Sequence, residues 1–66
     1  MKYYLLPYLL AVRLGITDFR HGNSTIGYIA TSGDLAAVGI ESALAEGARE
    51  LTEAEAMNIM NKLKNH

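Results

Sequence analysis

Residues 3–14, which read YYLLPYLLAVRL, are the stretch whose conformation decides the fold. As a strand, this stretch places apolar side chains on both of its faces, a pattern that periodicity alone does not distinguish from a buried helix. The Tyr-Tyr-Leu-Leu start favours an extended chain, and we predict a strand over residues 3–14. Pro7 cannot donate a ladder hydrogen bond, so it marks an edge, a bulge or a break in that strand.

A helix is the alternative for the second part of this stretch. Pro7 would then occupy the first helical position and Gly15 would lie just past the helix end, the places that these two residue types prefer. A helix this short is marginal in water without tertiary contacts. The strand is therefore the preferred interpretation.

The middle of the chain predicts a second strand followed by a helix. A loop over residues 15–24 leads to a strand over residues 25–31, TIGYIAT, which is rich in β-branched and aromatic residues. The turn SGD ends at Asp34, a good N-cap for a helix over residues 34–47. A third strand over residues 35–40 is the competing interpretation. On the helix, Gly39, Ala43 and Gly47 would form a stripe of small side chains lying closely across the strands.

The last part of the chain predicts a connector and a helix. Residues 48–52 are a short extended connector or a brief strand. Thr52 and Glu55 have the spacing of a capping box, which predicts a helix beginning there. One face of this helix is apolar and consists of Ala56, Ile59, Met60 and Leu63. The whole chain, residues 1–66, is thus predicted to be one α+β domain, with a small antiparallel sheet of two or three N-terminal strands packed by two C-terminal helices.

Composition restricts both the means of stabilisation and the partners. A chain of 66 residues buries only about 60% of its surface on folding, and small domains commonly need disulfides, a metal or self-association. The absence of cysteine excludes disulfides and fits a cytoplasmic location. His21 and His66 lie far apart in the sequence, so we expect no structural metal, and no motif indicates a cofactor. The apolar N-terminal run is too short to span a bilayer, and we expect no membrane association.

The stretch DFRHGNST, residues 18–25, is the one local cluster of polar groups suited to ligand binding. Asp18, Arg20, His21 and Asn23 are the candidate binding residues, because arginine grips anions bidentately and histidine titrates near neutral pH. A solvated loop with an Asp18–Arg20 contact is the favoured interpretation, with Phe19 anchoring the loop to the core. We predict no catalytic residues, since a triad of Ser24, His21 and Asp18 would be crowded into one short loop.

These features together favour a protein–protein association module that is not an enzyme. We expect the helices to cover one face of the sheet and leave the other, apolar face for a second copy of the chain or for another protein. The candidate interface residues are Tyr4, Leu6, Tyr8 and Leu10. The alternative is a nucleic-acid or nucleotide binder that uses the Arg20/His21 loop and the sheet tyrosines, but the formal net charge of −1 disfavours nucleic acid.

Overall fold

The computed structural model describes residues 2–18 and 20–64 of the chain. These residues form a four-stranded antiparallel sheet and three helices, which confirms the α+β class. In chain order the elements are β1 (Tyr3–Leu6), α1 (Tyr8–Leu14), β2 (Gly22–Asn23), β3 (Gly27–Thr31), α2 (Ile40–Ala45), β4 (Arg49–Leu51) and α3 (Glu53–Lys64). Phe19, which was predicted to anchor the loop, lies outside the described residues, as does His66.

The first strand lies in the interior of the sheet. The strand order is β2-β3-β1-β4, and Tyr4 of β1 is paired with Ala30 of β3 on one side and with Glu50 of β4 on the other. An interior strand makes ladder hydrogen bonds along both edges, so residues 3–6 are held by two neighbours. The strand predicted over residues 25–31 corresponds to β3, which begins two residues later, at Gly27, and the brief strand allowed for residues 48–52 corresponds to β4.

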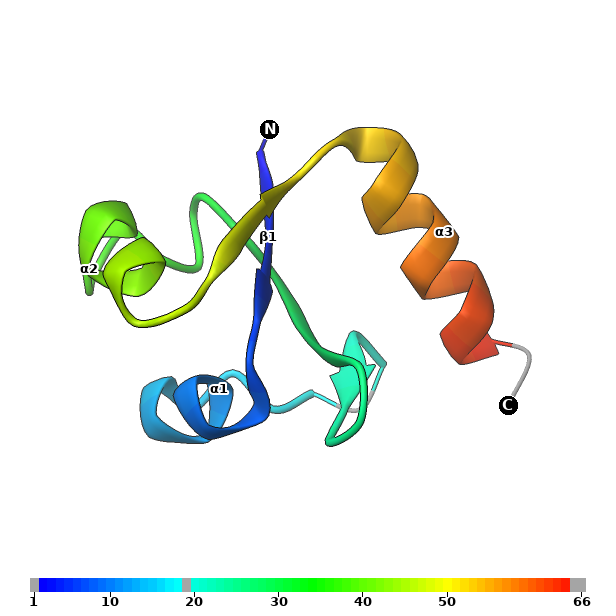
Figure 1. The fold of residues 1–66 in the computed structure, drawn as a ribbon, viewed down its shortest axis with the longest axis horizontal. Helices are drawn as coiled ribbons and strands as arrows, with labels where there is room; N and C mark the ends of the chain where they lie inside the picture. Colours follow the sequence, from blue (N-terminus) through cyan, green and yellow to red (C-terminus); the bar gives the residue numbers. More distant parts are fainter. Residues whose placement is uncertain (1, 19, 65–66) are drawn as a thin grey trace.

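Helices cover both faces of this sheet. Tyr4 and Leu6 point to one face and pack with α1 and α2, whereas Tyr3 and Leu5 point to the other face and pack with α3. Figure 1 shows α1 and α2 on one side of the strands and α3 on the opposite side. The expectation of a sheet with one uncovered apolar face is therefore wrong, and the two apolar faces of residues 3–6 are explained by burial on both sides.

The strand predicted over residues 3–14 ends at Leu6, and the helical alternative is correct for the residues that follow. Pro7 is the N-cap of α1, one position earlier than the first helical position considered for it. Gly15 ends the helix in the left-handed conformation, with φ of 74°, and its N–H donates to the carbonyl of Val12. Leu10 and Ala11 are buried against the sheet, and this tertiary contact stabilises a helix that would be marginal alone.

The helix predicted over residues 34–47 is also too long. Asp34 does not cap a helix: its carboxylate accepts from the N–H of Thr31, while the hydroxyl of Thr31 accepts from the N–H of Asp34. These bonds close a turn, and α2 begins only at Ile40. Residues 35–40 contain no strand, which removes that alternative. Gly39 and Gly47 flank α2 with positive φ, so the predicted stripe of small residues is not a helical face.

The C-terminal helix is the element predicted best. The N–H of Thr52 donates to the Glu55 carboxylate at 3.0 Å, and the N–H of Glu55 donates to the Thr52 hydroxyl at 3.1 Å, which is the capping box. Of the predicted apolar face, Ala56, Ile59 and Met60 pack with Ile29 and Leu51 of the sheet, whereas Leu63 is partly buried outside this cluster. Among the described residues, none of the helices has the length and apolar character needed to cross a membrane.

Candidate functional site

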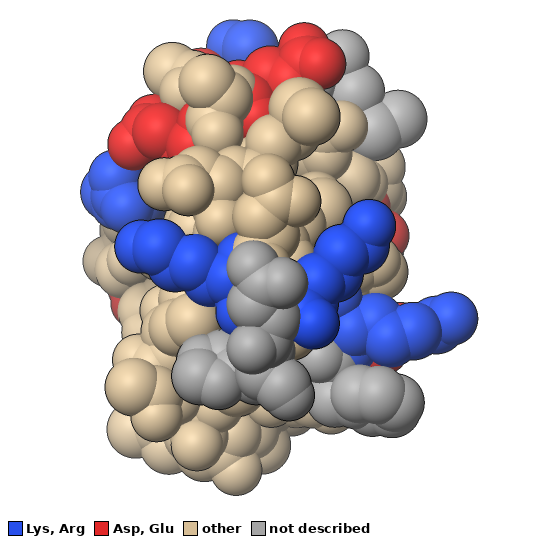
Figure 2. Space-filling view, turned by 90° about the vertical axis from the view of Figure 1, so that its right-hand side faces the viewer, with Lys and Arg blue, Asp and Glu red and all other residues tan. Residues whose placement is uncertain are grey.

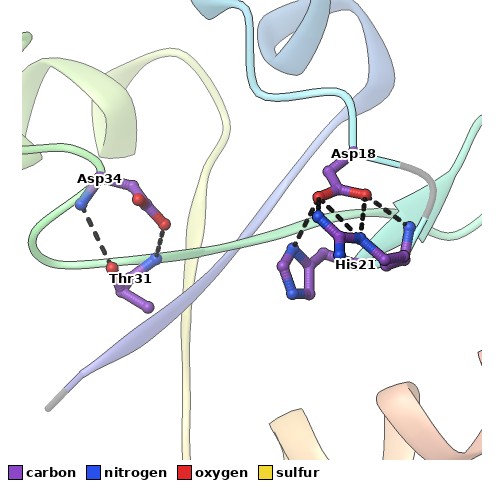
Figure 3. Close-up of polar contacts among 5 residues, drawn as sticks. Asp18, His21, Thr31 and Asp34 are labelled. Atoms are coloured by element: carbon purple, nitrogen blue, oxygen red, sulfur yellow. Dashed lines mark hydrogen bonds and ion pairs between the residues drawn. The ribbon is translucent and has the colours of Figure 1, made fainter.

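Asp18 and Arg20 form a bidentate ion pair in the loop before β2. The Arg20 Nη2 donates to Asp18 Oδ2 at 2.8 Å and the Arg20 Nε donates to Oδ1 at 3.1 Å (Figure 3). The backbone N–H of Arg20 adds a third bond to Oδ1, at 2.9 Å. The Asp18–Arg20 contact expected from the sequence is therefore present, and much of the anion-binding capacity of Arg20 is used within the loop.

This contact lowers the pKa of Asp18 from its ordinary value of 3.8 to about 2, chiefly because the Arg20 side chain donates to the carboxylate. The same bond raises the pKa of Arg20. Both side chains remain charged across the physiological range. Asp18 is thus an electrostatic and structural partner of Arg20, and a group ionised so firmly is a poor general acid at neutral pH.

His21 and Asn23 have different surroundings. His21 lies with Nδ1 at 3.9 Å from Asp18 Oδ2, and its side chain is half exposed. Asn23 accepts hydrogen bonds at Oδ1 from the N–H groups of Thr25 and Ile26, at 2.9 and 2.7 Å, and so closes the turn between β2 and β3. Of the four candidate binding residues, Arg20 and His21 are therefore the two whose side chains are available to a ligand.

The candidate interface residues are mostly inside the chain. Tyr4, Leu6 and Leu10 are 2%, 0% and 4% exposed, and they form the core between the sheet and the two helices on its first face. They cannot touch a partner while the chain keeps this structure. Tyr8 is 43% exposed, and one side of its ring packs on Tyr28, with ring centroids 6.3 Å apart.

Instead, the exposed apolar surface next to these residues lies on the outer side of α1. Leu9 is 75% exposed and Val12 is 49% exposed, and the helical period places Val12 beside both Tyr8 and Leu9. We call Tyr8, Leu9 and Val12 the α1 outer face. Arg13 follows on the same helix and forms an ion pair with Glu46 just after α2. Sequence reasoning missed Leu9 and Val12 because it placed this segment in a strand.

Two of the grooves in the described part of the chain adjoin these candidate residues. The first, of about 270 Å³, lies between α1 and α2, next to the α1 outer face, and its walls include Leu10, Leu14, Val38 and Ala43. The second, of about 470 Å³, lies between the Arg20–His21 loop and the end of α3. Its remaining lining residues are Met60, Leu63 and Lys64. No local sequence pattern indicates this second groove, because only the folded sheet brings α3 beside the loop.

Metal binding and base stacking each require a specific arrangement of side chains. Within residues 2–18 and 20–64, no three histidine, aspartate or glutamate side chains are arranged to hold a metal ion. Tyr4 and Tyr28 are buried, so these sheet tyrosines offer no open ring face on which a base could stack. The nucleic-acid alternative therefore loses two of its sheet tyrosines, while Tyr3 in β1 is only partly buried.

Comparison with known proteins found no protein family model, no characterised protein and no solved structure that matches this chain.

Proposed function

We propose that this protein is a non-catalytic association module of the cytoplasm that pairs with a second copy of itself through the α1 outer face. The observation that carries this proposal is the exposure of Leu9, 75%, beside Tyr8 and Val12 on a helix of only seven residues. A contiguous apolar patch left in water is typical of an interaction surface. The cysteine-free composition supports the reducing compartment.

A second copy of the chain is the favoured partner because this surface combines a projecting side chain with a recess that can receive it. A two-fold interface presents the same patch from both subunits, so each projecting group needs a recess in the same patch. Here Leu9 projects, and the groove between α1 and α2 is the neighbouring recess. Arg13 and Glu46, of opposite charge, lie at the border between them. In the proposed dimer, Leu9 of each copy enters the groove of the other.

The size of the chain supports association as well. Among the described residues, Leu6 and Leu35 are the only large side chains with essentially no exposure, and the other hydrophobic residues at 0% are alanines. A domain of this length gains little free energy from a core alone. Covering Leu9, Val12 and the adjoining groove would remove further apolar surface from water, at about 25 cal/mol per Å².

Sedimentation velocity of the full chain and of two matched variants tests this function. We expect the wild-type mass to rise from 7.2 kDa toward twice that value as concentration increases from about 10 µM to about 1 mM. Leu9→Glu places a charge in the centre of the proposed contact and should weaken association at least about tenfold.

Met57→Glu is the control, because Met57 is also exposed but lies on α3, across the sheet from α1. This variant should associate as the wild type does. A wild-type chain that stays monomeric at about 1 mM would overturn the proposal. So would a Leu9→Glu variant that dimerises as strongly as Met57→Glu.

A further inference from the structure

The groove at the C-terminal end of α3 has the composition of a binding site. One wall is formed by Arg20 and His21, and the other by Met60, Leu63 and Lys64. Met60 and Leu63 are only partly buried, so they give the groove an apolar surface between its basic residues. The volume of about 470 Å³ lies within the range of roughly 300–1,000 Å³ usual for ligand sites.

Positive charge is concentrated on this side of the molecule. Lys2, Arg13, Arg20 and Arg49 each form an ion pair with a carboxylate. Within the described ranges, Lys62 and Lys64 have no such partner, and both lie in the last turn of α3. Figure 2 shows Lys and Arg side chains across the middle of the face that carries α3, with the acidic side chains mostly gathered nearer its top.

Arg20 retains binding capacity despite its contact with Asp18. The Asp18 carboxylate occupies Nε and Nη2, and Nη1 makes no hydrogen bond to the described residues. The positive charges of Arg20 and Lys64 outweigh the single negative charge of the Asp18 carboxylate. The groove therefore has a net positive charge. This favours an occupant with a small number of negative charges, because a guanidinium edge and an ammonium can each bind one carboxylate.

We infer that this groove binds an acidic peptide segment of a partner protein, with one large aliphatic side chain of the peptide placed on Met60 and Leu63 and its flanking carboxylates on Lys64 and Arg20. The thioether of Met60 is flexible and adapts to apolar side chains of different shape. A nucleic acid fits less well, because few phosphates would be neutralised and the described lining residues include no Phe, Tyr or Trp ring, His21 being the one stacking side chain among them. The site lies across the sheet from the α1 outer face, so the inference is independent of self-association.

Amide chemical shifts of the full-length 15N-labelled chain, in the Leu9→Glu background to keep it monomeric, test the inference. The probe is a capped pentapeptide with leucine at its centre and glutamate at the other four positions. We expect saturable shifts centred on Arg20, His21, Met60 and Lys64, with a Kd between about 10 µM and about 1 mM. Replacing the four glutamates by lysine, or the leucine by alanine, should weaken binding at least about fivefold.

Two variants with the same change of charge locate the site. Lys64→Ala should weaken peptide binding at least about threefold, whereas Lys62→Ala, on the opposite side of the same helical turn, should change it by less than about 1.5-fold. The spectra themselves report whether each variant is folded. Absent or non-saturating shifts, shifts outside the groove, or equal effects of the two variants would each overturn the inference. Stronger binding of a single-stranded oligonucleotide at the same amides would also overturn it.

Discussion

Two glycines at the β2–β3 contact have no space for a side chain. A Cβ on Gly22 would lie 2.6 Å from the Cα of Tyr28, and a Cβ on Gly27 would lie 2.5 Å from the carbonyl oxygen of Leu6. Gly27 also has φ of 103°, which side-chain-bearing residues rarely adopt. The close approach of the backbones here positions the loop that carries Arg20 and His21.

The first prediction concerns Gly22. Gly22→Ala should lower the free energy of unfolding by about 3 kcal/mol, because backbone atoms rather than a movable side chain occupy the space of the new methyl group. Urea unfolding followed by circular dichroism measures this. Gly33→Ala is the control, since its Cβ would meet only the Thr31 hydroxyl at 3.6 Å, and it should change the stability by less than about 1 kcal/mol. Equal effects of the two substitutions would contradict the structure.

The second prediction concerns the Asp18 carboxyl. NMR titration should place its pKa at about 2, and Arg20→Gln should move it back toward 3.8 because the principal hydrogen-bond donor is lost. The folded pKa lies below the unfolded one, so this ion pair contributes stability above about pH 4 that is lost as the pH falls toward 2. Arg49→Gln, which removes a distant cation, should leave Asp18 unchanged. An unshifted Asp18 in the wild type would show that the loop pair does not form in solution.

At the scale of single elements, the start of α3 depends on two side chains. Thr52 and Glu55 satisfy each other's backbone N–H groups, and this lowers the pKa of Glu55 through the hydrogen bonds from Thr52. Thr52→Ala should therefore lower the free energy of unfolding by about 1 kcal/mol. Asn58→Ala, at an exposed position within α3, is the control and should have little effect or stabilise slightly. Thermal unfolding compares the two, and equal melting temperatures would contradict the capping role.

The elements also differ in how far their sequences determine them. The capping box and apolar face of α3 are local signals, and both were correct. Residues 8–14 were ambiguous because α1 is apolar on its core side and on its outer side, so its pattern lacks a polar face. Between β3 and α2, the mutual bonds of Thr31 and Asp34 form a turn where a helix start was expected. Thr52 and Glu55 form the same pair of reciprocal bonds at the start of α3, so the residue types alone do not show whether a helix follows.

At the scale of the whole molecule, three layers are built from a very short chain. The radius of gyration is 10.8 Å, and helices lie on both faces of the sheet, as Figure 1 shows. The α+β class followed from the sequence, but the coverage of both faces did not, because the two predicted helices were expected on one face, whereas α2 and α3 lie on opposite faces. For the same reason the predicted interface lay on side chains that are buried. The groove beside α3 joins segments distant in sequence, and no local pattern indicates it.

The proposed dimer makes the α1 outer face and the groove between α1 and α2 a single interface. Intermolecular NOEs between a 13C-labelled copy and an unlabelled copy of the chain test that claim directly. We predict NOEs from the Leu9 methyl groups of one copy to Leu14 and Val38 of the other. A dimer whose intermolecular NOEs come from α3 or β4, with none from Leu9, would contradict the account.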